Sequence, residues 1–136
     1  MSARVLLIDD DATLLALMKD AFAKCGFEIY SADNGKSGVE LFHTVQPDLV
    51  VCDIVMPERE GISVIREIKT GLFDTGLIAV SGGGERGGFS YLRWARELGA
   101  DLILRKPFRM SMLLWMAHEL LSPMVDGSPN DPTQKR

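Results

Sequence analysis

The stretch that decides the fold lies near the N-terminus, where residues 5–11 read VLLIDDD. Four apolar residues in succession, with no polar residue between them, are typical of a strand covered on both faces of a parallel sheet. The run ends abruptly in the carboxylates of Asp9, Asp10 and Asp11. This segment therefore predicts a buried strand that ends in a cluster of acids.

Four more short apolar runs follow, over residues 27–31, 49–53, 77–81 and 102–105. The segments between them carry apolar residues at helical spacing; the first of these stripes is Leu14, Met18, Ala21 and Cys25. A last helix is expected over residues 110–121. Because strands and helices alternate, the pattern predicts an α/β fold with a doubly wound parallel sheet and helices on both faces.

The chain has 136 residues, of which 46% are hydrophobic, and this suits one globular domain over residues 1–121. Residues 122–136 hold three prolines among mostly polar residues, so they are expected to form a disordered tail. No second domain is expected.

Composition argues against several classes of function. A net charge of −4 gives no basic footprint for direct nucleic-acid binding. No apolar stretch approaches the roughly 20 residues that cross a bilayer, and no signal segment is recognisable, so no membrane association is expected. Cys25 and Cys52 lack metal-site spacing and are expected to be free thiols of a cytoplasmic protein.

The ends of the expected strands carry the polar residues of interest. In a doubly wound sheet, ligands bind outside the carboxyl ends of the strands. The first run ends in Asp9 and Asp10, the third ends in Asp53, the fourth ends in Ser81, and Lys106 follows the fifth. If the strands are parallel, these groups meet at one edge.

Clustered carboxylates repel one another unless a cation compensates, and hard oxygen ligands suit Mg²⁺. We expect Asp10 to hold the metal with Asp9 assisting, whereas Asp11 is expected to cap the following helix. Asp53 could then attack phosphorus as a nucleophile, and the ammonium of Lys106 could hold a phosphoryl oxygen. For Ser81 two interpretations stay open: a hydroxyl donor to the phosphoryl group, or a turn cap before Gly82.

Four motifs together resemble the receiver domains of bacterial two-component response regulators, in particular the single-domain, chemotaxis-regulator type. They are VLLIDDD at residues 5–11, VVCDIVMP at 50–57 with Gly61, AVS at 79–81 and RKPF at 105–108. The resemblance implies a flavodoxin-like sheet of five parallel strands in the order 2-1-3-4-5. It also implies a protein that accepts a phosphoryl group from a histidine kinase or a histidine phosphotransfer protein.

The resemblance also implies roles for individual residues. Asp53 would be the phosphoacceptor and Asp10 a direct ligand of Mg²⁺ or Mn²⁺, with Asp9 acting through water. Val55 would contribute its backbone carbonyl to the metal. Lys106 would pair with the phosphoryl group, and Ser81 would hydrogen-bond it in the active state.

Three features depart from the family pattern. Ile103 stands where the family often has a switching Tyr or Phe. The segment that follows Ser81, residues 82–88, contains five glycines among its seven residues. This composition predicts that the loop is the element that moves on phosphorylation. In the family, the positions of Val55 and Gly83 border the phosphoryl group and influence its hydrolysis; neither residue can position the attacking water, although the open glycine site could also admit it.

Two apolar stripes lie off the expected core faces of the last two helices. They consist of Tyr91, Trp94 and Leu98 in one helix and of Met112, Trp115 and Met116 in the other. Such residues favour a protein interface, for a homodimer, a kinase or a downstream target, although burial in the seam between the helices is the alternative.

The sequence thus predicts a signalling phosphoacceptor, not an enzyme beyond its own phosphorylation and dephosphorylation. A phosphorelay intermediate, which passes the group to a downstream histidine, is the alternative. A phosphatase of the haloacid-dehalogenase type would need a second acid where Val55 stands. A nucleotide-binding module would need a phosphate-binding glycine motif that the chain lacks. The intact acids and Lys106 argue against a degenerate receiver that serves only as a scaffold.

Overall fold

The computed structural model describes residues 2–56, 60–71, 74–82 and 91–122, and the side chains of Glu60, Tyr91 and Leu92 lie outside the described part. Strands and helices alternate along the chain. The strands are β1 (Arg4–Ile8), β2 (Glu28–Ala32), β3 (Leu49–Asp53), β4 (Gly76–Ser81) and β5 (Leu102–Arg105). The helices are α1 (Ala12–Lys24), α2 (Gly35–Val45), α3 (Glu60–Thr70), α4 (Tyr91–Glu97) and α5 (Met110–Leu121).

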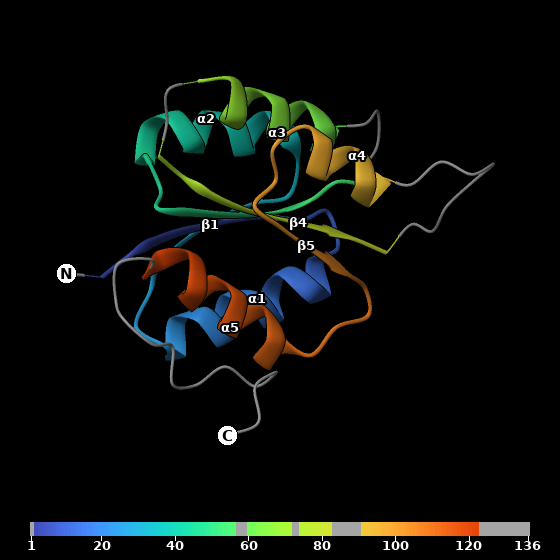
Figure 1. Cartoon of the computed structure of the whole chain (residues 1–136). Coiled ribbons are helices and arrows are strands. Elements are labelled where there is room, and N and C mark those ends of the chain that lie inside the picture. The colour runs from blue at the N-terminus through green and yellow to red at the C-terminus, as the bar shows by residue number, and fades with distance from the viewer. Residues whose placement is uncertain (1, 57–59, 72–73, 83–90, 123–136) are drawn as a thin grey trace.

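The strands form one parallel sheet in the order β2-β1-β3-β4-β5, which confirms the predicted topology. Helices α2, α3 and α4 cover one face, and α1 and α5 cover the other (Figure 1). Because both faces are covered, β1 from residue 5 onward and all of β3 are buried. The domain boundary at residue 121 and the disordered tail stay predictions, because residues 123–136 lie outside the described part.

Helix α1 has the predicted N-cap, but its buried face differs in part from the predicted one. Asp11 is its N-cap, as predicted: the carboxylate accepts hydrogen bonds from the backbone N–H groups of Thr13 and Leu14. The predicted apolar stripe is only partly confirmed: Met18 is buried and Leu14 and Ala21 are half-buried, but Cys25 is the exposed C-cap, and the helix buries Leu15 and Phe22 together with Met18. These three residues share one face at spacings of three and four, and burying a Phe and a Leu removes more apolar area than burying an Ala and a Cys.

Polar groups at the amino end of the sheet are closely paired. The backbone N–H of Arg4 donates to Asp48 Oδ2 at 2.8 Å, and Arg4 Nε lies 2.8 Å from Glu28 Oε2. Asp101 Oδ2 accepts from the backbone N–H of Leu77 at 2.8 Å and from Lys69 Nζ at 2.9 Å. At this end of the sheet, each of these carboxylates therefore accepts a hydrogen bond or an ion pair from a neighbouring residue. Within the described ranges, no helix combines the length and apolar character needed to cross a membrane.

Candidate phosphoacceptor and metal site

The carboxyl ends of the strands bring together residues that lie far apart in the chain. Asp53 is the last residue of β3 and Ser81 is the last residue of β4, while Asp9 directly follows β1 and Lys106 directly follows β5. The parallel register pairs Ile8 with Cys52 and Ser81 with Arg105, so these strand ends are level with one another. All four polar side chains thus arise at one edge of the sheet.

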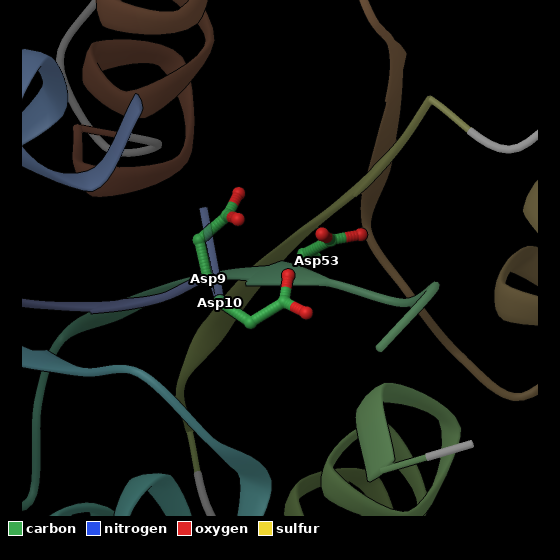
Figure 2. Close-up of side chains that lie close together, drawn as sticks. All are labelled: Asp9, Asp10 and Asp53. Carbon is green, nitrogen blue, oxygen red and sulfur yellow. The ribbon is translucent and has the colours of Figure 1, made fainter. Parts of the chain in front are cut away.

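Three carboxylates cluster at this edge. One oxygen from each of Asp9, Asp10 and Asp53 lies within 4.8 Å of the others. Figure 2 shows how the three side chains project from the ends of β1 and β3. Asp9 and Asp53 are buried, at 1% and 4% exposure, whereas Asp10 is exposed. The cluster is therefore rooted in the core and open to solvent on the Asp10 side.

Lys106 is the cation that faces the two buried acids. Its Nζ lies 3.1 Å from Asp9 Oδ2 and 3.2 Å from Asp53 Oδ2. Backbone groups hold the other oxygens: Asp9 Oδ1 accepts from the N–H of Asp11 at 2.8 Å, and Asp53 Oδ1 accepts from the N–H of Val55 at 2.9 Å. Each buried carboxylate is thus fixed by one backbone donor and by the same ammonium.

Asp10 differs from its neighbours. Its side chain makes no hydrogen bond or ion pair with any other residue in the described part of the chain. An exposed carboxylate beside two buried ones, with nothing bonded to it, is sterically and electrostatically open to a cation.

The electrostatics of the cluster appear in its pKa values. Burial raises the pKa of Asp53 to about 6; the charge of Asp9 adds to this rise, while the Val55 N–H and Lys106 oppose it. Burial also opposes the charged form of Lys106, but the carboxylates of Asp53 and Asp9 outweigh it and raise the pKa of the ammonium. Lys106 therefore stays protonated near neutral pH, and Asp53 is ionised above pH 6.

These residues fit a divalent metal. The donors are carboxylate oxygens, which Mg²⁺ and Mn²⁺ prefer. Three carboxylates facing one ammonium leave two negative charges at the edge, a deficit that one divalent cation would balance. Asp10, with both oxygens open, and Asp53 are the residues that would hold it.

The other predicted residues lie at the ends of β3 and β4, in β5 and in α4. Ser81 is buried at the end of β4, and its backbone carbonyl accepts from the N–H of Lys106 at 2.9 Å. Val55 is half-buried and packs against the core layer beneath α2, α3 and α4. Ile103 in β5 packs against the same layer, and so does Trp94 from α4. No aromatic ring occupies the Ile103 position, so movement there would be movement of an aliphatic side chain.

The proposed interface residues lie apart from the acids, on α4 and α5. Trp94, Met112, Trp115 and Met116 are all half-buried. Met116 packs against the core layer beneath α1 and α5, so part of the second stripe belongs to the core. The side chain of Tyr91 lies outside the described part, as do Pro57, Gly83 and the rest of the glycine-rich loop beyond Gly82.

Gly61 has a structural role that its place in the sequence motif did not predict. A Cβ at this position would overlap the backbone carbonyl oxygen of Asp53 and the Cα of Ile54. Helix α3 can therefore approach the end of β3 only because residue 61 has no side chain. A glycine a few residues after a strand-end aspartate was the only available signal.

A groove next to Lys106 was also missed. It has a volume of about 500 Å³ and runs between α1 and the segment that joins β5 to α5. Its apolar lining includes Leu14, Leu17, Pro107 and Phe108. Leu17, at 57% exposure, is the one large apolar side chain that is strongly exposed among the described residues. Periodicity alone could not show that α1 leaves this leucine uncovered.

The chain belongs to the response regulator receiver domain family, because the model of that family matches residues 5–118. It is 35% identical over 123 residues to the chemotaxis protein CheY of Bacillus subtilis, an alignment that covers 90% of this chain and all of that protein. It is also 35% identical to the chemotaxis protein CheY of Thermotoga maritima, covering 84% of this chain and 93% of the relative. The chain is therefore a CheY-like receiver domain of two-component signalling.

Solved structures agree with this fold. The CheY-like receiver domain protein from Methanospirillum hungatei superposes with a TM-score of 0.82 at 24% identity, covering 90% of this chain and 96% of that one. A receiver domain from Clostridium thermocellum superposes with a TM-score of 0.79 at 28% identity, covering 89% and 95% of the two chains.

Proposed function

We propose that this receiver domain accepts a phosphoryl group on Asp53 in a metal-dependent reaction, and that it signals through phosphorylation-dependent contacts with other proteins. The observation that carries the proposal is the cluster of three carboxylates, two of which pair with Lys106. A cluster whose charges were all paired would gain little from binding a metal ion. This cluster has two more negative than positive charges, and the carboxylate of Asp10 is accessible to a cation.

The transfer needs no proton from the protein. Above pH 6 the Asp53 carboxylate is ionised, and one of its oxygens forms a bond to phosphorus. The bond between phosphorus and the donor, a histidine nitrogen or the oxygen of a small acyl phosphate, breaks and its electron pair leaves with the donor. A bound Mg²⁺ or Mn²⁺ would offset the charge of the phosphoryl oxygens.

Other residues of the chain would orient the group. Lys106 already reaches Asp53 Oδ2, so its ammonium can follow the phosphoryl oxygens as a point charge. Ser81, at the end of the next strand, would donate its hydroxyl to the group, and the Val55 carbonyl would complete the metal site. Asp9 stays bonded to Lys106 and to the Asp11 N–H, which suits an indirect role towards the metal.

The partners follow from the same site. A histidine kinase or a phosphotransfer protein would supply the group, and the groove beside Lys106 with exposed Leu17 offers such a protein an apolar surface close to Asp53. Trp94 on α4 and Met112 and Trp115 on α5 would contact a downstream target or a second copy of the chain. Transfer onward to another histidine is the alternative outcome, and phosphotransfer profiling against purified histidine kinases and phosphotransfer proteins separates donors from acceptors.

The decisive test is the mass of the intact protein after incubation with acetyl phosphate and Mg²⁺. We expect a gain of one phosphoryl group that is stable in acid and labile in base, as an acyl phosphate is. The same incubation of the Asp53→Asn variant should give no gain. An unchanged wild-type mass, or an equal gain in the variant, would refute the proposal.

A further inference from the structure

The backbone that carries Asp53 is held on several sides. The carbonyl oxygen of Asp53 accepts a hydrogen bond from Sγ of Cys52 at 3.3 Å. The next backbone N–H, that of Ile54, donates to the carbonyl of Val80 in the neighbouring strand at 2.9 Å. Asp53 and Ile54 are both buried. The end of β3 is therefore fixed by the sheet up to residue 54.

Helix α3 meets this backbone at Gly61, the second residue of the helix. A Cβ built on Gly61 would overlap the carbonyl oxygen of Asp53 and the Cα of Ile54, and it would lie 2.8 Å from the carbonyl carbon of Ile54. Ordinary contacts between carbon atoms are about 3.5–4.0 Å. All three of these neighbours are main-chain atoms, so no side-chain rotation can make room. A side chain at position 61 therefore requires the helix and the strand end to separate by on the order of 1 Å.

Glycine is required at position 61 for space and not for backbone conformation. The described glycines with positive φ are Gly26 and Gly99, so Gly61 has a conformation that alanine can adopt. Alanine is also the stronger helix former. Local helix propensity therefore favours alanine at position 61, and the contact with residues 53 and 54 opposes it.

The two sides of this contact are anchored differently. On the helix side, Ile62, Val64 and Ile65 are fully buried in the core layer beneath α2, α3 and α4. On the strand side, the N–H of Val55 donates to Oδ1 of Asp53 at 2.9 Å and not to the sheet. Because the Ile54–Val55 peptide is planar and rigid, a displacement of Ile54 moves this N–H as well. Half of the required separation, about 0.5 Å, already reaches the tolerance of a catalytic arrangement.

We infer that Gly61 is a positioning residue for phosphoryl transfer: because it has no side chain, α3 packs directly on the backbone of residues 53 and 54 and so sets the direction of the Asp53 carboxylate. The inference rests on the proposed function and deepens it, since it assigns the orientation of the nucleophile to a residue outside the acidic cluster. Gly61 acts through the backbone of Ile54 and the N–H of Val55, not by contact with the reacting atoms.

The test uses Gly61→Ala in the full chain, with acetyl phosphate and Mg²⁺, well below the melting temperature of the variant. At saturating acetyl phosphate we expect the rate constant of phosphorylation to fall by about tenfold or more, towards the roughly hundredfold that a 1 Å misplacement can cause. Destabilisation of the helix alone would not produce this loss, because the rate is measured on folded protein.

The matched control is Ile68→Ala, which removes a buried side chain from the same helix, about two turns beyond Gly61. This variant should melt at a lower temperature, because a cavity is left in the core layer. Its rate constant should nevertheless stay within about twofold of the wild type. Equal losses of rate in the two variants would overturn the inference, since general loosening of α3 would then explain both. A Gly61→Ala protein that does not fold, under conditions in which Ile68→Ala folds, would also overturn it.

A structural readout keeps the inference separate from the proposed function. In a crystal structure of Gly61→Ala we expect Oδ1 of Asp53 to lie more than about 3.5 Å from the backbone nitrogen of Val55, beyond hydrogen-bond range. A bond kept at 2.9 Å, with only the helix displaced, would overturn the inference even if the rate falls. Failure of the wild type to gain a phosphoryl group would refute the proposed function, and the distance between Asp53 and Val55 would still decide the role of Gly61.

Discussion

The two ends of the sheet differ in how their carboxylates are paired with donors and cations. At the amino end, Asp48 and Asp101 accept backbone hydrogen bonds from Arg4 and Leu77, and Asp101 has Lys69 as its own counter-ion. At the carboxyl end, one oxygen from each of three carboxylates lies within 4.8 Å of the others, and two of these acids, Asp9 and Asp53, share the ammonium of Lys106.

This difference separates charges that stabilise the fold from charges that are available for chemistry. A carboxylate that accepts a buried backbone N–H and pairs with its own cation lowers the free energy of the folded state. Carboxylates that crowd one another raise it unless a ligand brings positive charge. The carboxyl end is thus the end that gains most from a metal. Substitutions at the two ends should therefore have opposite consequences for activity and stability.

The largest effect on phosphorylation is expected from replacing one acid at each end of the sheet in separate variants. Asp53→Asn should abolish the phosphoryl adduct, because the nucleophilic oxygen is lost. Asp101→Ala should keep the adduct and lower the free energy of unfolding by about 1–2 kcal/mol, since two donors lose their acceptor. Intact mass and urea denaturation of both variants test this pair. Adduct formation by Asp53→Asn, or its loss in Asp101→Ala, would break the contrast between the ends.

The second effect concerns the metal. Asp10→Asn should weaken Mg²⁺ binding by more than about tenfold, the loss that even an outer-sphere partner can cause. Asp48→Asn at the amino end is the matched control and should leave the Mg²⁺ affinity unchanged. A metal titration followed by calorimetry measures both. An unaltered titration for Asp10→Asn would make Asp10 an ordinary surface acid.

The third effect is the pH dependence of stability. The pKa of Asp53 is about 6 in the folded protein and about 3.9 in an unfolded chain, so between these values the folded state holds a proton that the unfolded state has lost. Raising the pH through this window therefore lowers the free energy of unfolding, and the loss is nearly complete about one pH unit above the folded pKa of about 6.

Asp53→Asn removes this titration. In the absence of metal, its stability relative to the wild type should rise between about pH 4 and about pH 7 by about 2–3 kcal/mol and then stay constant. Urea denaturation at several pH values measures the difference. If the free energy of unfolding depended on pH in the same way in both proteins, burial would not raise the pKa of Asp53. Saturating Mg²⁺ should reduce the gap, because the metal favours the ionised carboxylate.

The smallest effect should come from Asp11, which is adjacent to the acids but caps α1. Asp11→Ala should cost about 1 kcal/mol of stability through the lost cap and should still allow the adduct to form. Glu28→Gln, at the half-exposed ion pair with Arg4, should cost less still, at most about 0.5 kcal/mol. Thermal unfolding measures the stability of both variants, and the intact mass after incubation with acetyl phosphate shows whether the adduct forms. A loss of the adduct in Asp11→Ala would place this residue in the site.

The sequence by itself determined the architecture and the candidates. Continuous apolar runs predicted the strands within one residue of their bounds, and polar residues directly after those runs predicted which side chains would meet. In α1, where local periodicity was the only guide, the buried face is rotated about the helix axis relative to the predicted one. This helix has apolar residues on several sides, so the elements that pack against it determine which of them are buried.

Only the tertiary structure decided how the assembled groups interact. It places Lys106 on both buried acids, leaves Asp10 open, and requires glycine at position 61, where β3 and α3 meet. Strand order and register, not spacing along the chain, set the distances between residues that are 50 or 100 positions apart. Burial and charge pairing depend on those distances. The residues that gather at this edge could thus be predicted from the chain, whereas their charge pairing and geometry could not.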